Sequence, residues 1–431
     1  MKEVNRLALP AILANIAEPI IALVDTAFIG HIGTEALGGI GIGSSLFLLF
    51  IWVLTQTKTA ISAIVSRHYG AQTLEKIQGL IPQVLFSVLI LGLIVAFLTD
   101  YFSLHLLRLY SAEGQVLEQA DKYFSIRSKG FPLVLCTYTI FGIFRGIQNT
   151  SWAMIISISA AVLNVILDVV LIFGIEGVIP KMGIEGAAWA SLMAQAFMLI
   201  CAIILMFKKT PFRFRLSNKL HSELKYMLGL SSGFIIRTLA LNVTFFLANR
   251  YATSYGDEYI AAHTIAVNIW LFSSYFIDGY ANAGNALSGR LLGSGNTSEL
   301  FRIGKKLMFI SIGIGGLLGF FYLSIYPWIG SFFSEDLAVL TLFNSIFWIV
   351  IVAQPLNAIA FSFDGVFKGL GRAKFLMNTL LIASFLGFLP LLILGDYLDW
   401  GLYGIWMAFV LFMLIRALTL FMEFRKSYFS I

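Results

Sequence analysis

Polar side chains recur inside apolar stretches of this sequence, where an ionised group is unfavourable. Asp25 lies late in the run 7–29, which is otherwise almost entirely apolar. A charged aspartate at the centre of a membrane helix costs roughly 2.5–3.5 kcal/mol on insertion scales. On a helix, Asn15, Glu18 and Asp25 share one face. A carboxylate kept in such a place indicates an ion or substrate pathway.

Further polar groups occur on two later apolar stretches. Asn164 and Asp168 are four positions apart and therefore share a helix face, and Ser191 follows the small residues of GAAWA, which let another helix approach closely. Removal from water disfavours the charged form of a carboxylate, so such an acid can bind a proton on one side of a membrane and release it on the other. With amide and hydroxyl oxygens nearby, the same acids could instead hold Na⁺.

A purely structural role is the alternative for these acids, as hydrogen-bond partners of neighbouring helices. Polar pairs between membrane helices contribute only about 0.6 kcal/mol on average. That gain is small beside the cost of placing Asp25 and Asp168 among apolar residues, so the structural alternative is disfavoured.

The composition predicts that membrane helices position these residues. Of 431 residues, 59% are hydrophobic and 12% are charged, whereas soluble domains carry about 25% charged residues. A span needs roughly 20 apolar residues. We expect an all-α integral membrane protein with twelve spans, at 7–29, 38–66, 80–98, 118–145, 152–174, 185–207, 227–251, 260–290, 305–326, 338–367, 375–395 and 401–424.

The basic residues predict the orientation of these spans. Lysine and arginine concentrate between alternate spans, most densely in 208–226, which places both termini in the cytoplasm and the protein in a cytoplasmic (inner) membrane. They form no single patch, so no nucleic-acid partner is expected. No phosphate-binding glycine loop, zinc-protease motif or nucleophile elbow occurs, so we expect no enzyme and no cofactor.

The sequence also contains an internal repeat, in which the second half matches the first at a constant offset. Glycine, proline and arginine match in register over a long ungapped stretch: Gly33 with Gly256, Arg67 with Arg290, Pro132 with Pro355, and Gly146 with Gly369. After a short slip, GIEGAAWA at 183–190 matches GLYGIWMA at 401–408. Six spans in each half predict two six-helix bundles related by a parallel pseudo-two-fold repeat. The expected domains are an N-terminal lobe 1–207, a cytoplasmic linker 208–226 and a C-terminal lobe 227–431.

Several motifs resemble the MATE (multidrug and toxic compound extrusion) family. They are VDTAFIGHIG at 24–33 and FRGIQNT at 144–150; RTLAL at 237–241 and SSYFIDGYANAGNALSGRLLG at 273–293 are similar to its DinF-like branch. The resemblance implies a twelve-helix antiporter that exports amphipathic, often cationic compounds in exchange for protons or Na⁺. It also implies that Asp25, Asn164, Asp168 and Ser191 form a proton or cation site in the first lobe.

Other membrane residues are candidates for a substrate cavity, although ion-paired or packing roles compete for each of them. These candidates are Glu18, Lys58, Phe144, Met154, Arg237, Asp278 and Asn285. Asp364, near the end of its span, has the same two interpretations. Arg127 and Lys129 are expected to extend from a span end to the membrane interface.

We therefore predict a monomeric secondary antiporter for amphipathic small molecules in membrane lipid, with proton coupling preferred over Na⁺. A flippase for lipid-linked or polyisoprenoid substrates, with a wide cationic cavity, is the nearest alternative. A receptor or channel is the alternative from another class. Through the two offsets, the polar cluster corresponds to apolar residues or glycine in the second half: Ala248, Gly387, Leu391 and Phe409. This asymmetry predicts that only the first lobe handles the coupling ion.

Overall fold

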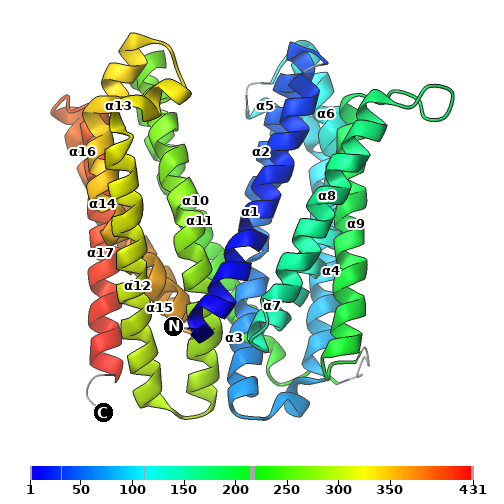
Figure 1. Ribbon diagram of the computed structural model, residues 1–431, viewed down its shortest axis with the longest axis vertical. Helices are drawn as coiled ribbons and strands as arrows, with labels where there is room; N and C mark the ends of the chain where they lie inside the picture. Colours follow the sequence, from blue (N-terminus) through cyan, green and yellow to red (C-terminus); the bar gives the residue numbers. More distant parts are fainter. Residues whose placement is uncertain (1, 31, 111, 214–218, 429–431) are drawn as a thin grey trace. The chain divides into compact units, whose positions relative to one another are not determined.

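The computed structural model describes residues 2–30, 32–110, 112–213 and 219–428, except for the side chains of residues 17–20, 22, 23 and 428. Within this described part the chain is almost entirely helical (Figure 1), and the only strand-like pairing is an isolated bridge between Ile175 and Ile179. Ten described helical segments are long and apolar enough to cross a membrane. Helix α1 and the pair α6–α7 correspond to the two other predicted spans. The predicted all-α membrane fold is confirmed.

Contacts divide the chain into two compact units. The first unit is Leu13–Leu228, and the second unit is Gly229–Ile431 together with Met1–Ile12. The helices up to the basic connector are α1 (Lys2–Gly30), α2 (Thr34–Leu54), α3 (Gln56–Gly70), α4 (Leu80–Tyr101), α5 (Ser103–Arg108), α6 (Gly114–Ser128), α7 (Phe131–Gly146), α8 (Ser151–Phe173) and α9 (Ile184–Lys209). A 3-10 turn, Leu74–Ile77, precedes α4.

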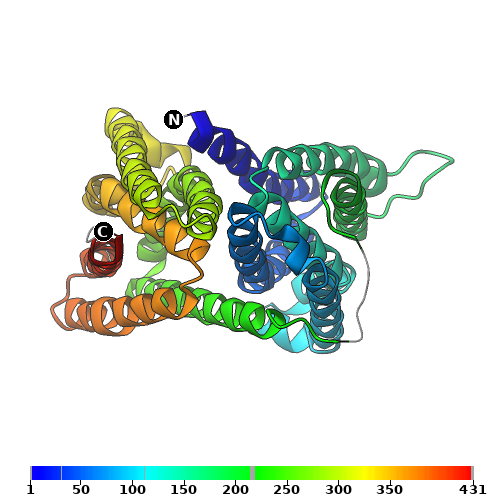
Figure 2. The same cartoon turned by 90° about the horizontal axis from the view of Figure 1, so that it is seen from below.

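The second half repeats this order. Its helices are α10 (Leu224–Tyr255), α11 (Asp257–Gly293), α12 (Thr297–Ser324), α13 (Tyr326–Ile329), α14 (Leu337–Gly369), α15 (Ala373–Ile382), α16 (Leu389–Tyr397) and α17 (Leu402–Tyr428). A 3-10 turn, Gly330–Phe332, follows α13, and a π-helical turn, Ala383–Phe388, joins α15 to α16. The start of α1 lies beside the helices of the second unit (Figure 2), where Glu3 pairs with Arg290 of α11.

The repeat seen in the sequence is present in the helix boundaries. The offset that matches Gly33 with Gly256 carries the segment from Thr34 to Gly70 onto α11 at both ends, and the segment from Gly114 to Gly146 onto α14 at both ends. Breaks are the main difference between the halves. Gly130 and Pro132 separate α6 from α7, whereas α14 continues through Pro355. Glycine and proline both weaken a helix, and at the matching positions α14 carries only the proline.

Two glycines make the same close helix contact in both units. A Cβ atom at Gly142 would overlap the carbonyl oxygen of Lys58, which brings α7 against α3. A Cβ atom at Gly365 would likewise overlap the carbonyl oxygen of Ala281, which brings α14 against α11. Since the repeat offset relates the two glycines and also their two contacts, the duplicated sequence has kept both the glycine and its packing.

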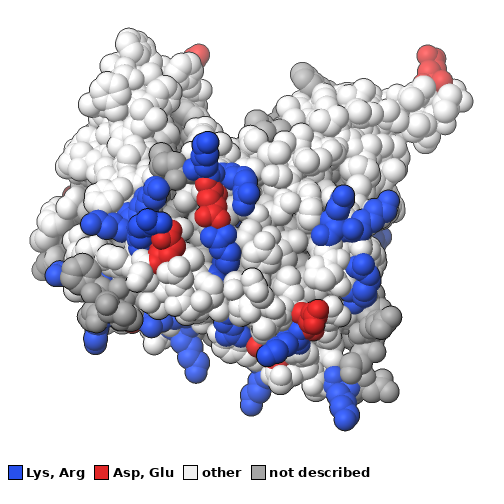
Figure 3. All heavy atoms as spheres, turned by 60° about the horizontal axis from the view of Figure 1, so that its bottom comes forward, with Lys and Arg blue, Asp and Glu red and all other residues white. Residues whose placement is uncertain are grey.

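The outer faces and the helix ends match a lipid environment. Large apolar side chains such as Phe97, Leu317 and Phe320 are each about two-thirds exposed or more, which is unfavourable in water and expected against lipid. Lysine and arginine gather near one end of the helices in each unit (Figure 3). In the first unit, part of the basic connector is tied to that end, because Glu223 pairs with Arg67 at 3.0 Å. The proposed lobe and linker boundaries stay a prediction.

The glycine contact predicts a stability difference. Gly365→Ala should lower the free energy of unfolding by about 1–3 kcal/mol, because its methyl group overlaps backbone that cannot move aside. Gly313→Ala is the matched control, since nothing lies within 4 Å of a Cβ atom there. Thermal unfolding of both variants in detergent measures the difference; equal melting temperatures would contradict the packing described.

Candidate ion-coupling site

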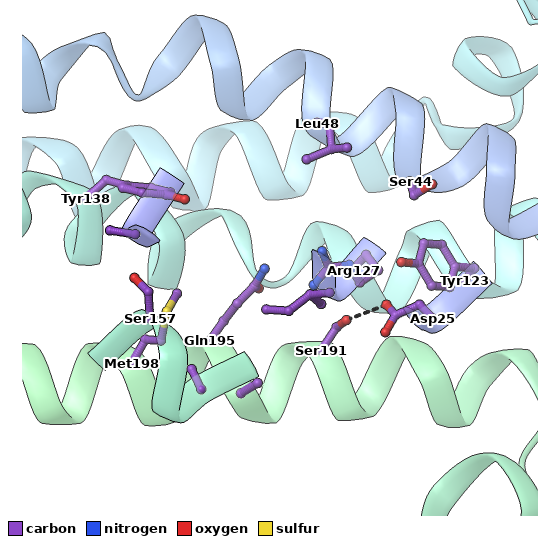
Figure 4. Close-up of a pocket in the computed structure, with 14 residues that line it drawn as sticks. Asp25, Ser44, Leu48, Tyr123, Arg127, Tyr138, Ser157, Ser191, Gln195 and Met198 are labelled. Carbon is purple, nitrogen blue, oxygen red and sulfur yellow. Dashed lines mark hydrogen bonds between the residues drawn. The ribbon is translucent and has the colours of Figure 1, made fainter. Parts of the chain in front are cut away.

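The four polar residues predicted to act together meet inside the first unit. Asp25 of α1 is 1% exposed, and its Oδ2 atom accepts a hydrogen bond from Ser191 Oγ of α9 at 2.9 Å (Figure 4). Asn164 of α8 donates from Nδ2 to Ser191 Oγ at 3.5 Å. Asp168, one turn further along α8, is fully buried. The structure thus brings together residues that lie far apart in the sequence.

The local sequence explains how α8 and α9 present these groups. On α8, Ser157, Ala160, Asn164 and Asp168 form a buried stripe at helical spacing. On α9, a Cβ atom at Gly186 would overlap backbone of α8 at Leu171 and Ile172. The absent side chain lets the two helices approach closely, and this contact sets Ser191 beside Asn164.

Several oxygens of this cluster lack a hydrogen-bond donor among the described side chains. They are Oδ1 of Asp25, Oδ1 of Asn164 and both carboxylate oxygens of Asp168. Asp25 and Asp168 lie close enough for each carboxyl group to influence the other electrostatically. Ionised carboxylates only accept hydrogen bonds, so the pair is satisfied when it holds a proton or a cation. A buried pair of this kind is able to bind and release one.

A cavity of about 30 Å³ lies beside Asp25 and Ser191, enough space for a water molecule. Figure 4 shows the polar side chains that line it, which come from six helices: Asp25, Ser44, Tyr123, Arg127, Tyr138, Ser157, Ser191 and Gln195. The cavity therefore offers polar space for a water molecule beside Asp25 within the first unit.

Arg127 is a member of this site that the sequence did not reveal. Its side chain is buried, 7% exposed, and its guanidinium lies 4.2 Å from the ring centroid of Phe47. The expectation that Arg127 extends to the membrane interface is wrong, because α6 turns this side chain into the bundle. The available signal was the spacing of Tyr123 and Arg127, four positions apart, which puts both on one helix face.

The second unit has a different arrangement of buried charge, centred on Asp364 of α14. Its Oδ1 atom accepts from Arg237 Nη2 at 2.6 Å, and its Oδ2 atom accepts from Lys368 Nζ at 2.7 Å. Arg416 of α17, which the sequence analysis did not single out, lies 3.7 Å from Oδ1. Asp278 is within the electrostatic influence of the same charges. We call Arg237, Asp278, Asp364, Lys368 and Arg416 the second-unit charge network.

The remaining cavity candidates are spread over the chain. Lys58 lies over the ring of Tyr138, 4.7 Å from its centroid, and Phe144 meets Trp152 edge to face. Met154 is half-buried on α8, and Asn285 is buried on α11. The side chain of Glu18 lies outside the described residues. A substrate cavity formed by this set stays a prediction.

At the repeat positions of the polar cluster, the second unit is packed with aromatic rings. Phe409, the counterpart of Ser191, contacts four aromatic rings with centroids 4.9–5.9 Å away: Phe245, Trp270, Phe388 and Trp406. Ala248, the counterpart of Asp25, is fully buried. The polar site therefore occurs on one side of the repeat.

A family model completes the assignment. The MatE model matches residues 10–170 and again residues 234–393, so both halves of the repeat are matched and most of the chain is covered. The chain belongs to the MATE family. It is a membrane transporter for small molecules of the multidrug and toxic compound efflux class, and not an enzyme.

Relatives of this MATE protein cover nearly its whole length. DNA damage-inducible protein F of Escherichia coli is 26% identical over 437 residues, covering 99% of this chain and 92% of its own. Protein DETOXIFICATION 44, chloroplastic, of Arabidopsis thaliana is 29% identical, covering 96% and 80%. A Vibrio cholerae MATE transporter crystallised in a bent form superposes with a TM-score of 0.91 at 20% identity, covering 100% of this chain and 97% of that one. The two-lobe MATE fold is therefore shared.

The second-unit charge network predicts a large stability effect. Asp364→Asn should destabilise the protein by about 3–5 kcal/mol, because buried cations lose their central counter-charge. Glu118→Gln is the control, since its pair with Lys122 is at the surface, where ion pairs contribute little. Thermal unfolding in detergent compares them. An Asp364→Asn variant as stable as wild type would show that the network is not central.

Proposed function

We propose that this MATE transporter is an antiporter that exports amphipathic, often cationic compounds in exchange for protons. The observation that carries the proposal is a pair of buried carboxyl groups, Asp25 and Asp168, that influence one another and have oxygens without a donor among the described side chains. Relatives named probable multidrug resistance protein NorM, at 24–27% identity, support export as the direction.

The hydrogen-bond directions favour a proton over Na⁺ at this site. Ser191 points its hydroxyl hydrogen at Asp25, and its oxygen accepts from the amide nitrogen of Asn164. In this arrangement the Asn164 amide nitrogen and the Ser191 hydroxyl both act as hydrogen-bond donors, whereas a Na⁺ ligand must direct a lone pair at the ion. One proton between Asp25 and Asp168 adds the missing second donor.

Proton exchange would drive transport through the conformation of the first unit. Protonation removes one buried anion, so it favours the conformation in which the acids are least exposed to water. The size of this effect is limited by the difference in proton affinity between the two conformations. Transporters built from a parallel repeat alternate access by rocking two lobes. In this proposal, protonation of the acids shifts the equilibrium between the two conformations of the transporter. Release of the proton on the opposite side of the membrane shifts the equilibrium back.

The membrane and the orientation belong to the same proposal. The basic residues at one end of each unit support a cytoplasmic membrane location with both termini inside. We propose that the protein acts there as a monomer surrounded by lipid, without a nucleic-acid partner.

Asp25→Asn tests the proton proposal. The amide keeps the shape and the hydrogen bond from Ser191 but cannot cycle a proton, so uptake of a cationic dye such as ethidium into inside-out proteoliposomes under a pH gradient should fall to the rate of empty liposomes. Asp100→Asn, at an exposed position on α4, should transport at the wild-type rate. A pH-driven rate in Asp25→Asn equal to wild type would refute proton coupling at this site, and a wild type driven by a Na⁺ gradient alone would refute the choice of ion.

Cysteine labelling tests the orientation. In a background lacking Cys136 and Cys201, single cysteines at Ser222 and Glu335 should react from opposite sides, because these positions flank opposite ends of the helices. An impermeant maleimide applied to intact cells should label position 335 alone. Labelling of both positions would overturn the proposed topology.

A further inference from the structure

Arg127 places a fixed positive charge inside the site that holds the two acids. It lines the same cavity as Asp25 and Ser191, and Figure 4 shows it among the labelled side chains there. Its Nε and Nη1 atoms have no hydrogen-bond partner among the described residues, although both are buried. A buried guanidinium that has donors without a partner and lines the same cavity as Asp25 needs an electrostatic explanation.

Four helices contribute titratable groups to the site. The titratable groups are Asp25 on α1, Tyr123 and Arg127 on α6, Tyr138 on α7 and Asp168 on α8, while α2 and α9 contribute only uncharged residues to the cavity. Asp25 and Arg127 both act electrostatically on Asp168. Among the residues that line the cavity, Asp25 and Arg127 are the charged ones. The charges considered at this site are therefore two carboxylates and one guanidinium.

We propose that Arg127 is the resident counter-charge that limits this site to a single exchangeable proton. This inference rests on the proposed function, since it takes Asp25 and Asp168 as the exchanging acids. With both acids ionised, the guanidinium offsets one of the two negative charges. One proton then makes the site neutral.

The cost of burying an unbalanced charge disfavours both the site without a proton and the site with two protons. A site with an uncompensated negative charge binds a proton readily, because burial disfavours the ion. A second proton would leave Arg127 as an uncompensated buried cation, and breaking a buried charge balance in that way is strongly unfavourable. Arg127 is in this sense a positioning residue, acting through the acids.

Substitutions that change the charge should change the number of protons in a defined way. Arg127→Gln removes the counter-charge, so the site should take up two protons where wild type takes up one. Asp168→Asn leaves Asp25 balanced by Arg127, so this variant should take up none. The double variant Asp168→Asn/Arg127→Gln again has one unbalanced carboxylate, so it should regain one proton. A purely structural arginine would not produce that recovery.

Infrared difference spectroscopy of the purified full-length protein counts these protons without a substrate. The carboxyl C=O band is compared between about pH 8 and about pH 5, with the Asp25→Asn/Asp168→Asn variant as baseline. Relative to wild type, we expect the band to double in Arg127→Gln, to vanish in Asp168→Asn and to return to wild-type area in the double variant. Arg127→Lys keeps the charge and should match wild type. Lys122→Gln removes a charge from the exposed face of α6 and should also match it.

The outcomes separate this inference from the proposed function. An unchanged band in Arg127→Gln, or a double variant that stays silent, would overturn the role of Arg127 while leaving proton coupling intact. Wild-type dye transport in Asp25→Asn would instead refute the proposed function. If Arg127→Gln does not fold, two other variants still test the inference. The double variant keeps the wild-type net charge of the site. In Asp168→Asn, a carboxyl group that titrates would contradict the proposed charge balance.

Discussion

A charge removed from water must be balanced inside the protein, and the two units meet this requirement in different ways. In the second unit, Asp364 holds Arg237 and Lys368 in direct ion pairs, with Arg416 close by. Each charge there has an opposite charge nearby, so the network is suited to holding α10, α14 and α17 together. In the first unit, Asp25 and Asp168 keep oxygens that have no donor among the described side chains, and in the proposed function a mobile proton supplies the balance.

The repeat shows how one scaffold came to contain both solutions. Ala188 and Ser191 of the first unit correspond to Trp406 and Phe409 of the second, where large rings fill the bundle. Small side chains at these positions leave the space that the cavity and the polar cluster occupy. A change of side-chain volume at a few interior positions therefore separates an ion site from a packed core, while the backbone and its glycine contacts stay the same.

The sequence was most informative where a polar residue occurs within an apolar stretch. Helical spans follow from apolar runs, and Asp25 and Asp168 are identifiable because acids are rare among such residues. The repeat needed only glycine, proline and arginine in register. By contrast, the position of Arg127 depends on Phe47 and on the break between α6 and α7, both of which are tertiary features. Arg416 was missed for a related reason: its partner Asp364 lies on a different helix, far earlier in the chain, so local spacing carries no trace of the pair.

The glycine contacts have a mechanical consequence. Gly142 and Gly146 lock α7 against α3 at backbone distance, and Gly365 and Gly369 do the same for α14 and α11. Such contacts tolerate little sliding, because no flexible side chain lies between the two backbones. Gly186 holds α9 against the backbone of α8 in the same way. In the first bundle, α3 with α7 and α8 with α9 are therefore each expected to move as a pair. The second of these pairs carries Asn164 and Ser191, whereas Asp25 lies on α1.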